Sequence, residues 1–195
     1  GAAIGEGTNS YDLDDDSYST YFNEDGTATD ALSADGDYTL NVGTLTNKDI
    51  KITSGSQINI IGKEGAGFIN NGTIVIGDGT GMAGSIIVSG LKITNTNKNP
   101  IVVDQYSTKV TIDGNKLDLT YDGTFVENAI AIFTKGFVED ITISNNVIEM
   151  VSAAYYTYGI DLTYYYDYPA YGRTNARDFF VAGNDINIHS TAASG

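Results

Sequence analysis

A ten-residue pattern recurs four times along this chain of 195 residues, each time without a gap. Each copy has two alternating apolar positions, a turn of three small or polar residues, and one or two further apolar positions. Alternation with a period of two on both sides of a fixed turn predicts two short strands that meet at one corner. The copies are IIVSGLKITN (86–95), VTIDGNKLDL (110–119), ITISNNVIEM (141–150) and FFVAGNDINI (179–188).

The apolar positions of these copies are predicted to face inward, and one turn position is predicted to form a ladder. The third turn residue is Asn115, Asn146 or Asn184 in three copies and Leu91 in the first. Stacked asparagines at the strand spacing can bond through their side-chain amides, and asparagine tolerates a left-handed backbone. The inward set is Ile86, Val88, Ile93, Val110, Ile112, Leu117, Leu119, Ile141, Ile143, Ile148, Met150, Phe179, Val181, Ile186 and Ile188.

A third short apolar run follows three of the copies, at 100–104, 129–133 and 159–163. Three strands per repeat describe a triangular coil. The interval from Val88 to Ile112 is 24 residues and the next two intervals are 31 and 38 residues, with the growth in loops beside the third strand. A solenoid tolerates such insertions along one edge. The sequence therefore predicts an all-β fold, a right-handed parallel β-helix with three-strand coils, an asparagine ladder and variable loops on one edge.

The predicted domain organisation has two parts. Residues 1–20 are polar and are expected to form a flexible N-terminal arm, whereas 21–195 form the solenoid, with 21–37 as its N-terminal cap. Asp14, Asp15 and Asp16 lack the spacing of a calcium loop, so no metal site is predicted there. After Ile188 no third strand or cap follows; either a tail or a partner chain covers the last coil, or the sequence stops inside a longer solenoid, which we favour.

The composition excludes several classes of partner. The chain has 10 Lys and Arg against 25 Asp and Glu, a net charge of −15, which repels nucleic acid and anionic membrane surfaces. No segment approaches the ~18 consecutive apolar residues of a membrane span, so direct membrane insertion is not expected. Without cysteine there is neither a disulfide nor a thiolate metal site, and no cofactor is predicted.

The opening coil (22–52) and the motifs VTIDGN, ITISNN and FFVAGN resemble the adhesin-like surface proteins of gut methanogenic archaea, which carry parallel β-helix repeats. The resemblance covers nearly all of 21–195. It implies export, extracellular display at the cell surface, and contact with other cells, host glycans or cell-wall polymers. The repeat motif is shared by many β-helix proteins, so it carries no binding residue over to this chain. We expect a non-catalytic adhesin-like domain whose partner is a glycan or a cell-surface protein.

Two alternatives remain from the sequence. A polysaccharide lyase or glycoside hydrolase on the same scaffold would need paired carboxylates, or a calcium ion and a base. The only histidine, His189, lies near the end, and Asp118 and Glu149 share one frame position, which we interpret as solvated exterior charge. No catalytic residue is therefore predicted. The other alternative is a structural stalk.

The segment 155–173 holds eight of the fourteen tyrosines and is the predicted ligand site. Tyrosine suits saccharide recognition because its flat face packs on sugar C–H groups while its hydroxyl forms hydrogen bonds. The alternative is that the tyrosines of the loop 163–177 fold back on the coil and give that long loop its own small core. Ile160 and Leu162 are expected to face inward, with both tyrosine groups leaving near the same edge. The predicted ligand-binding residues are Tyr155, Tyr156, Tyr158, Asp161, Tyr164, Tyr165, Tyr166, Asp167, Tyr168, Tyr171 and Arg173.

Overall fold

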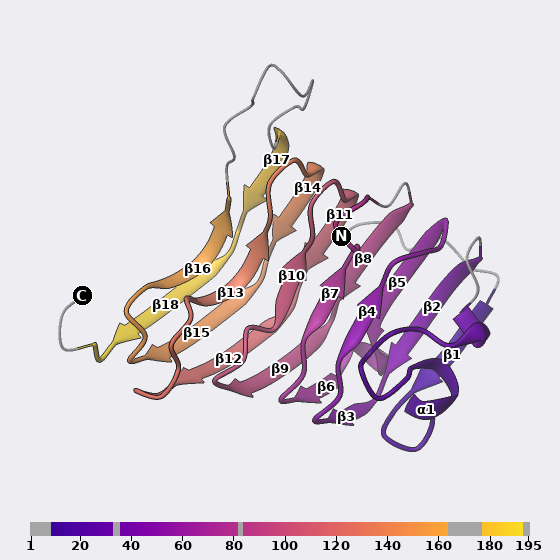
Figure 1. Cartoon of the computed structure of the whole chain (residues 1–195), viewed down its shortest axis with the longest axis horizontal. Helices are drawn as coiled ribbons and strands as arrows, with labels where there is room; N and C mark the ends of the chain where they lie inside the picture. Colours follow the sequence, from indigo (N-terminus) through magenta and orange to yellow (C-terminus); the bar gives the residue numbers. More distant parts are fainter. Residues whose placement is uncertain (1–8, 33–35, 82–83, 164–176, 193–195) are drawn as a thin grey trace.

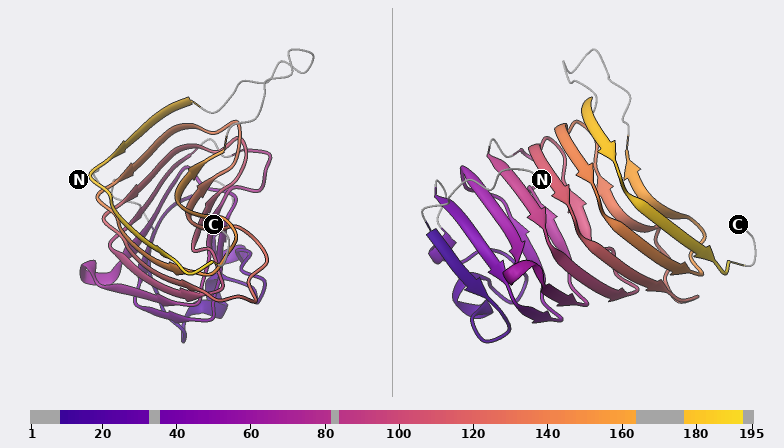
Figure 2. Two further views of the ribbon diagram at one scale, coloured as in Figure 1. Left: turned by 90° about the vertical axis from the view of Figure 1, so that its left-hand side faces the viewer. Right: turned by 180° about the vertical axis from the view of Figure 1, so that it is seen from behind.

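The chain folds into a solenoid of three parallel β-sheets, as predicted (Figure 1). The computed structural model describes residues 9–32, 36–81, 84–163 and 177–192. Seen from its C-terminal end, the chain turns counterclockwise as it advances toward the viewer (Figure 2, left), so the β-helix is right-handed. Each complete coil contributes one strand to each sheet, which places residues 20 to 40 positions apart in the sequence side by side.

The longest sheet has seven strands, all paired in parallel. Its register confirms the predicted repeat, since Val88 pairs with Ile112, Ile112 with Ile143, and Ile143 with Val181. Its strands, in spatial order, are β1 (Asn9–Leu13), β2 (Asp37–Val42), β5 (Gln57–Gly62), β8 (Ser85–Ser89), β11 (Thr108–Asp113), β14 (Glu139–Ser144) and β17 (Arg177–Ala182).

The second and third strands of the coils form sheets of six and five strands. The six-stranded sheet consists of β3 (Thr44–Thr46), β6 (Gly67–Asn70), β9 (Leu91–Thr96), β12 (Lys116–Tyr121), β15 (Val147–Ser152) and β18 (Asp185–Ser190). The five-stranded sheet consists of β4 (Ile50–Ile52), β7 (Ile74–Ile76), β10 (Ile101–Val103), β13 (Ala129–Thr134) and β16 (Thr157–Leu162).

The predicted asparagine ladder lies at the corner between the seven-stranded and six-stranded sheets. Asn146 Oδ1 accepts from both the backbone N–H and the side-chain amide of Asn115, each at 3.0 Å. Asn184 Oδ1 accepts from Asn146 in the same way, and the Leu91 backbone N–H donates to Asn115 Oδ1. The left-handed backbone, however, belongs to the residue before each asparagine, such as Gly114 or Asn145. The amide hydrogen bonds, rather than an unusual backbone at the asparagine itself, therefore account for this residue type.

The N-terminal end differs from the expected boundaries. Residues 9–13 form β1, paired in parallel register with β2, so this part of 1–20 is not a loose arm. The Asp15 backbone N–H donates to the Thr44 carbonyl in β3, and Thr27 forms an isolated parallel β-bridge with Lys51 in β4. These contacts continue the six-stranded and five-stranded sheets by one position each. Residues 9–32 thus follow the path of a coil, and they overlap the segment 21–37 that was predicted to be the N-terminal cap. Their helical turns are α1 (Tyr18–Tyr21) and η1 (Asp30–Leu32), with η2 (Lys63–Gly65) in the next coil.

The inward positions are buried in all coils but the last. In the final coil Phe179 is half-buried and packs on the core, but Val181, Ile186 and Ile188 are exposed. Within the described ranges, no strand stacks on β17 or β18 from outside. The same residue type at the same register position is thus buried in one coil and exposed in the next.

Two buried tyrosines make the stability of the fold sensitive to alkaline pH. Burial raises the pKa of Tyr18 to about 12, with the negative charge of Asp49 adding to the effect, and burial raises the pKa of Tyr121 further. An unfolded tyrosine ionises near pH 10, so the unfolded state loses protons that the folded state keeps. We expect stability to be unaffected by these groups below about pH 10 and to fall above it, by up to ~1.4 kcal/mol per pH unit for each tyrosine.

Urea unfolding at a series of pH values measures this slope. Tyr121→Phe removes one titrating group and should flatten the slope above pH 10, even though it also removes the hydrogen bond from the Tyr121 hydroxyl to Asn99 Oδ1 (2.8 Å). An unchanged slope in this variant would assign the alkaline loss to other groups.

Candidate functional site

The first part of the predicted site is the corner between β15 and β16, at residues 153–156. The buried Ser152 hydroxyl accepts from the Ala154 backbone N–H (3.1 Å) and from the Thr157 hydroxyl (2.7 Å), which fixes a tight turn. Ala154 points into the core and is 1% exposed. Because Ala154 takes the inward position, the next two residues project outward, and Tyr155 is 66% and Tyr156 51% exposed.

We call Tyr155, Tyr156 and Tyr158 the tyrosine corner. The rings of Tyr155 and Tyr156 meet edge to face, with centroids 4.6 Å apart and planes at 87°. The rings of Tyr156 and Tyr158 are nearly parallel, with centroids 6.3 Å apart and planes at 15°. Tyr158 lies within β16 rather than in the preceding loop and is 37% exposed. These rings contact one another while leaving much of their surface to solvent. The small core predicted for the loop 163–177 depends on residues outside the described ranges.

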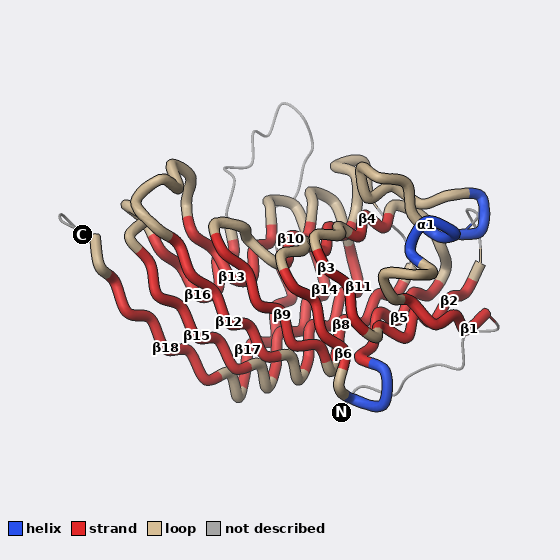
Figure 3. The backbone as a smooth tube through the Cα atoms, turned by 90° about the horizontal axis from the view of Figure 1, so that it is seen from below, coloured by secondary structure: helices blue, strands red, loops and turns tan. Residues whose placement is uncertain are grey.

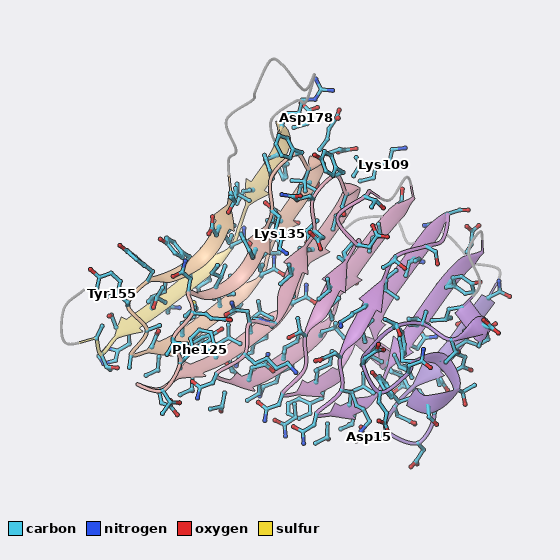
Figure 4. All side chains as sticks on the ribbon, in the orientation of Figure 1. Asp15, Lys109, Phe125, Lys135, Tyr155 and Asp178 are labelled. Carbon is cyan, nitrogen blue, oxygen red and sulfur yellow. The ribbon has the colours of Figure 1, made fainter. Side chains whose placement is uncertain are left out.

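The preceding coil extends this surface through the loop between β12 and β13, residues 122–128. The Ala129 backbone N–H donates to the Tyr156 carbonyl (3.0 Å), so the two connections lie against each other. Phe125 is half-buried and its ring packs against that of the buried Tyr121, with centroids 4.8 Å apart, whereas Val126 is 93% exposed. Figure 4 labels Phe125 and Tyr155 on these neighbouring coils. The corner therefore presents apolar and aromatic surface from two successive coils.

A hydrogen-bonded turn shapes the 122–128 loop. Asp122 accepts from the backbone N–H (2.9 Å) and the hydroxyl (2.6 Å) of Thr124. These hydrogen bonds, the hydroxyl first, hold the pKa of the exposed Asp122 carboxyl below its usual value. The same Asp-Gly-Thr turn occurs at 25–27 and 78–80, with the same lowered aspartate pKa. Its presence beside the tyrosine corner is thus a structural motif of this chain and carries no chemistry of its own.

Asp161, the one other described residue of the predicted site, does not join the tyrosine corner. Asp161 accepts a hydrogen bond from the Thr163 hydroxyl (3.1 Å) and lies three residues beyond Tyr158, about 10 Å of extended chain. Ile160 and Leu162 pack on the core, as predicted. Residues 159–162 of β16 separate Tyr158 from Thr163. The expectation that both tyrosine groups leave near the same edge depends on residues 164–171, which lie outside the described ranges. Outside the described residues lie Tyr164, Tyr165, Tyr166, Asp167, Tyr168, Tyr171 and Arg173.

The sequence analysis missed a groove on the outer face of the six-stranded sheet. This groove has a volume of about 600 Å³ and lies across β9, β12, β15 and β18. Asp118 and Glu149, assigned above to solvated exterior charge, both line it, together with His189. Their common frame position was visible in the sequence, but the hollow depends on how the sheet and its side chains are shaped. We call this feature the sheet groove.

Neither described surface has the ligands of a calcium-dependent lyase site. Among the residues that the structure describes, no group of three or more His, Asp or Glu side chains is placed to hold a metal ion. Arg177 is engaged with Glu139 in an ion pair of 3.1 Å on the seven-stranded sheet. No helix in the described part of the chain has the length and hydropathy needed to cross a membrane.

Comparisons with known proteins give no functional assignment for this chain. No protein-family model matches the chain, and neither a curated protein nor a solved structure matches it.

Proposed function

We propose that this chain is a non-catalytic, adhesin-like domain that is displayed at the cell surface and binds a saccharide through the tyrosine corner. The supporting observation is the exposure of three tyrosines whose rings contact one another. Tyr155 and Tyr156 lie on a turn that hydrogen bonds to the buried Ser152 hydroxyl hold in place, and Tyr158 lies at the start of β16. Exposed, pre-positioned tyrosines offer large contact area at a low cost in conformational entropy. The solenoid supplies a rigid base for this surface, since the turn is joined to the coil below by a backbone hydrogen bond.

The charge of the chain supports the same class of ligand. A net charge of −15 disfavours nucleic acid and anionic lipid surfaces but places no penalty on an uncharged sugar. The extracellular location is also part of the proposal. It rests on the resemblance of the repeat motifs to those of surface proteins.

A glycan array tests the proposal. The chain should bind a saccharide, and Tyr155→Ala combined with Tyr156→Ala should weaken that binding by about tenfold or more, since each aromatic face contributes roughly 1 kcal/mol. Phe180→Ala is the matched control, because Phe180 is also an exposed aromatic residue (61%) but lies on β17 of the seven-stranded sheet. Equal losses in both variants would contradict a specific role for the corner.

Three other outcomes would replace the proposal. Release of reducing or unsaturated sugar would favour a polysaccharide hydrolase or lyase. Binding of a protein but no glycan would favour a protein partner, and no binding with unchanged thermal stability in the tyrosine variant would favour a stalk.

A further inference from the structure

The sheet groove is built from side chains that stand in register on successive coils. One column consists of Thr94, Asp118, Glu149 and Asn187, and a second consists of Thr120, Val151 and His189. Figure 3 shows the strands of this sheet from below, with β9, β12, β15 and β18 side by side. Neighbouring members of a column are separated by the strand spacing of about 4.8 Å. The groove therefore presents a repeating series of polar groups along the axis of the solenoid.

This arrangement favours an extended, repetitive ligand over a compact one. The groove is open to solvent rather than enclosed, and its polar side chains offer both hydrogen-bond donors and acceptors. Val151, which is 47% exposed, adds an apolar surface in the middle of the second column. Hydroxyl-rich rings with apolar C–H faces, repeated along a chain, match alternating polar and apolar positions.

The groove leads toward the tyrosine corner. Strand β15 carries Glu149 and Val151 in the groove and ends at Ser152, and Tyr155 follows three residues later. A ligand that lies in the groove and extends past the end of β15 would thus reach the exposed rings.

The charges in the groove select among saccharides. Asp118 has a cationic partner, Lys92, at 3.7 Å. Glu149 is exposed and accepts a hydrogen bond from the neutral Asn187 amide (3.1 Å), so this contact leaves its negative charge uncompensated. Carboxylates of uronic or sialic acids and sulfate groups would be repelled here, whereas an ammonium group would be attracted.

We propose that the sheet groove binds a linear saccharide free of acidic groups, with amino sugars favoured over neutral ones through Glu149, and that this ligand continues onto the tyrosine corner. The proposal rests on the saccharide-binding function proposed above and adds the class of saccharide and a second contact surface.

Titration calorimetry with three sets of oligosaccharides tests this inference. Glucosamine oligomers should bind most tightly and N-acetylglucosamine oligomers more weakly. Oligogalacturonates should show no measurable binding. Glu149→Gln should weaken glucosamine binding by about fivefold and reduce its salt dependence, while leaving N-acetylglucosamine binding unchanged. Glu24→Gln is the matched control, because it makes the same charge change on an exposed residue between α1 and η1, outside the groove.

The variants separate the two proposals. Binding that depends on Tyr155 and Tyr156 but responds equally to Glu149→Gln and Glu24→Gln overturns the groove and leaves the tyrosine corner standing. Binding that Glu149→Gln weakens but the tyrosine variant does not overturns the corner and leaves the groove standing. Oligogalacturonate binding as tight as glucosamine binding overturns the charge selection.

Discussion

Replacing Asn146 with alanine is expected to destabilise the chain by about 3 kcal/mol, which corresponds to a fall in Tm of about 10 °C. The Asn146 side chain accepts two hydrogen bonds from Asn115 and donates to the Ile112 carbonyl and to Asn184 Oδ1. The substitution leaves the Asn115 backbone N–H and the Ile112 carbonyl without these partners in a buried corner. Each buried polar group that loses its partner costs roughly 1–3 kcal/mol.

Asn187→Ala is the control for this prediction. Asn187 also makes two side-chain hydrogen bonds, to Glu149 and Asp185, but all three residues are exposed, so water replaces the lost contacts. We expect it to change the free energy of unfolding, measured by urea titration, by no more than about 0.5 kcal/mol. Similar losses in both variants would show that burial of the ladder contributes nothing to stability.

Much of the fold could be predicted because residues that stack on one another in successive coils are of the same type and recur in the sequence. The turn asparagines and the alternating isoleucines and valines recur at intervals that stacked coils must obey, so the register of β11 with β14 follows from the sequence. Strand β1 was missed because its residues, NSYDL, contain little apolar sequence and its partner Tyr38 is almost 30 residues away from Asn9. Strand β6, GFIN, was missed because it is short and flanked by glycine turns.

The candidate site was less predictable, for physical reasons that differ between its parts. The tyrosine content of the β15–β16 turn was evident, but whether the rings face solvent depends on Ala154, which occupies the inward position. The sheet groove joins Asp118, Glu149 and His189, which come from three coils. Their alignment follows from the repeat, whereas the hollow above them depends on the size and direction of every neighbouring side chain. Sequence patterns specify alignment better than surface shape.

Under the two proposals above, the tyrosine corner and the sheet groove would contribute to saccharide recognition in different ways. The tyrosine corner offers apolar ring faces with little charge, and the sheet groove offers directed hydrogen bonds and a negative carboxylate. Aromatic contacts with sugar rings tolerate many different saccharides, whereas polar groups at fixed spacing discriminate among saccharides. In this arrangement affinity would come mainly from the corner and selectivity mainly from the groove, which is why the variants of Tyr155 and Glu149 are expected to differ in their effects across ligands.

The close approach of neighbouring coils predicts a second large effect on stability, for Gly62→Ala. Gly62 ends β5, where a Cβ atom would overlap the carbonyl oxygen of Gly90 in the next coil and lie 2.6 Å from the Gly67 backbone nitrogen. Backbone atoms cannot rotate away as a side chain can, so we expect a loss of about 3 kcal/mol, at the upper end of overpacking effects. Gly123→Ala adds the same methyl group in the 122–128 loop, where no atom lies within 4 Å, and should leave stability within about 0.5 kcal/mol. Thermal and urea unfolding of the two variants measure the difference, and a Gly62→Ala variant as stable as Gly123→Ala would mean that the coils can separate at this corner without cost.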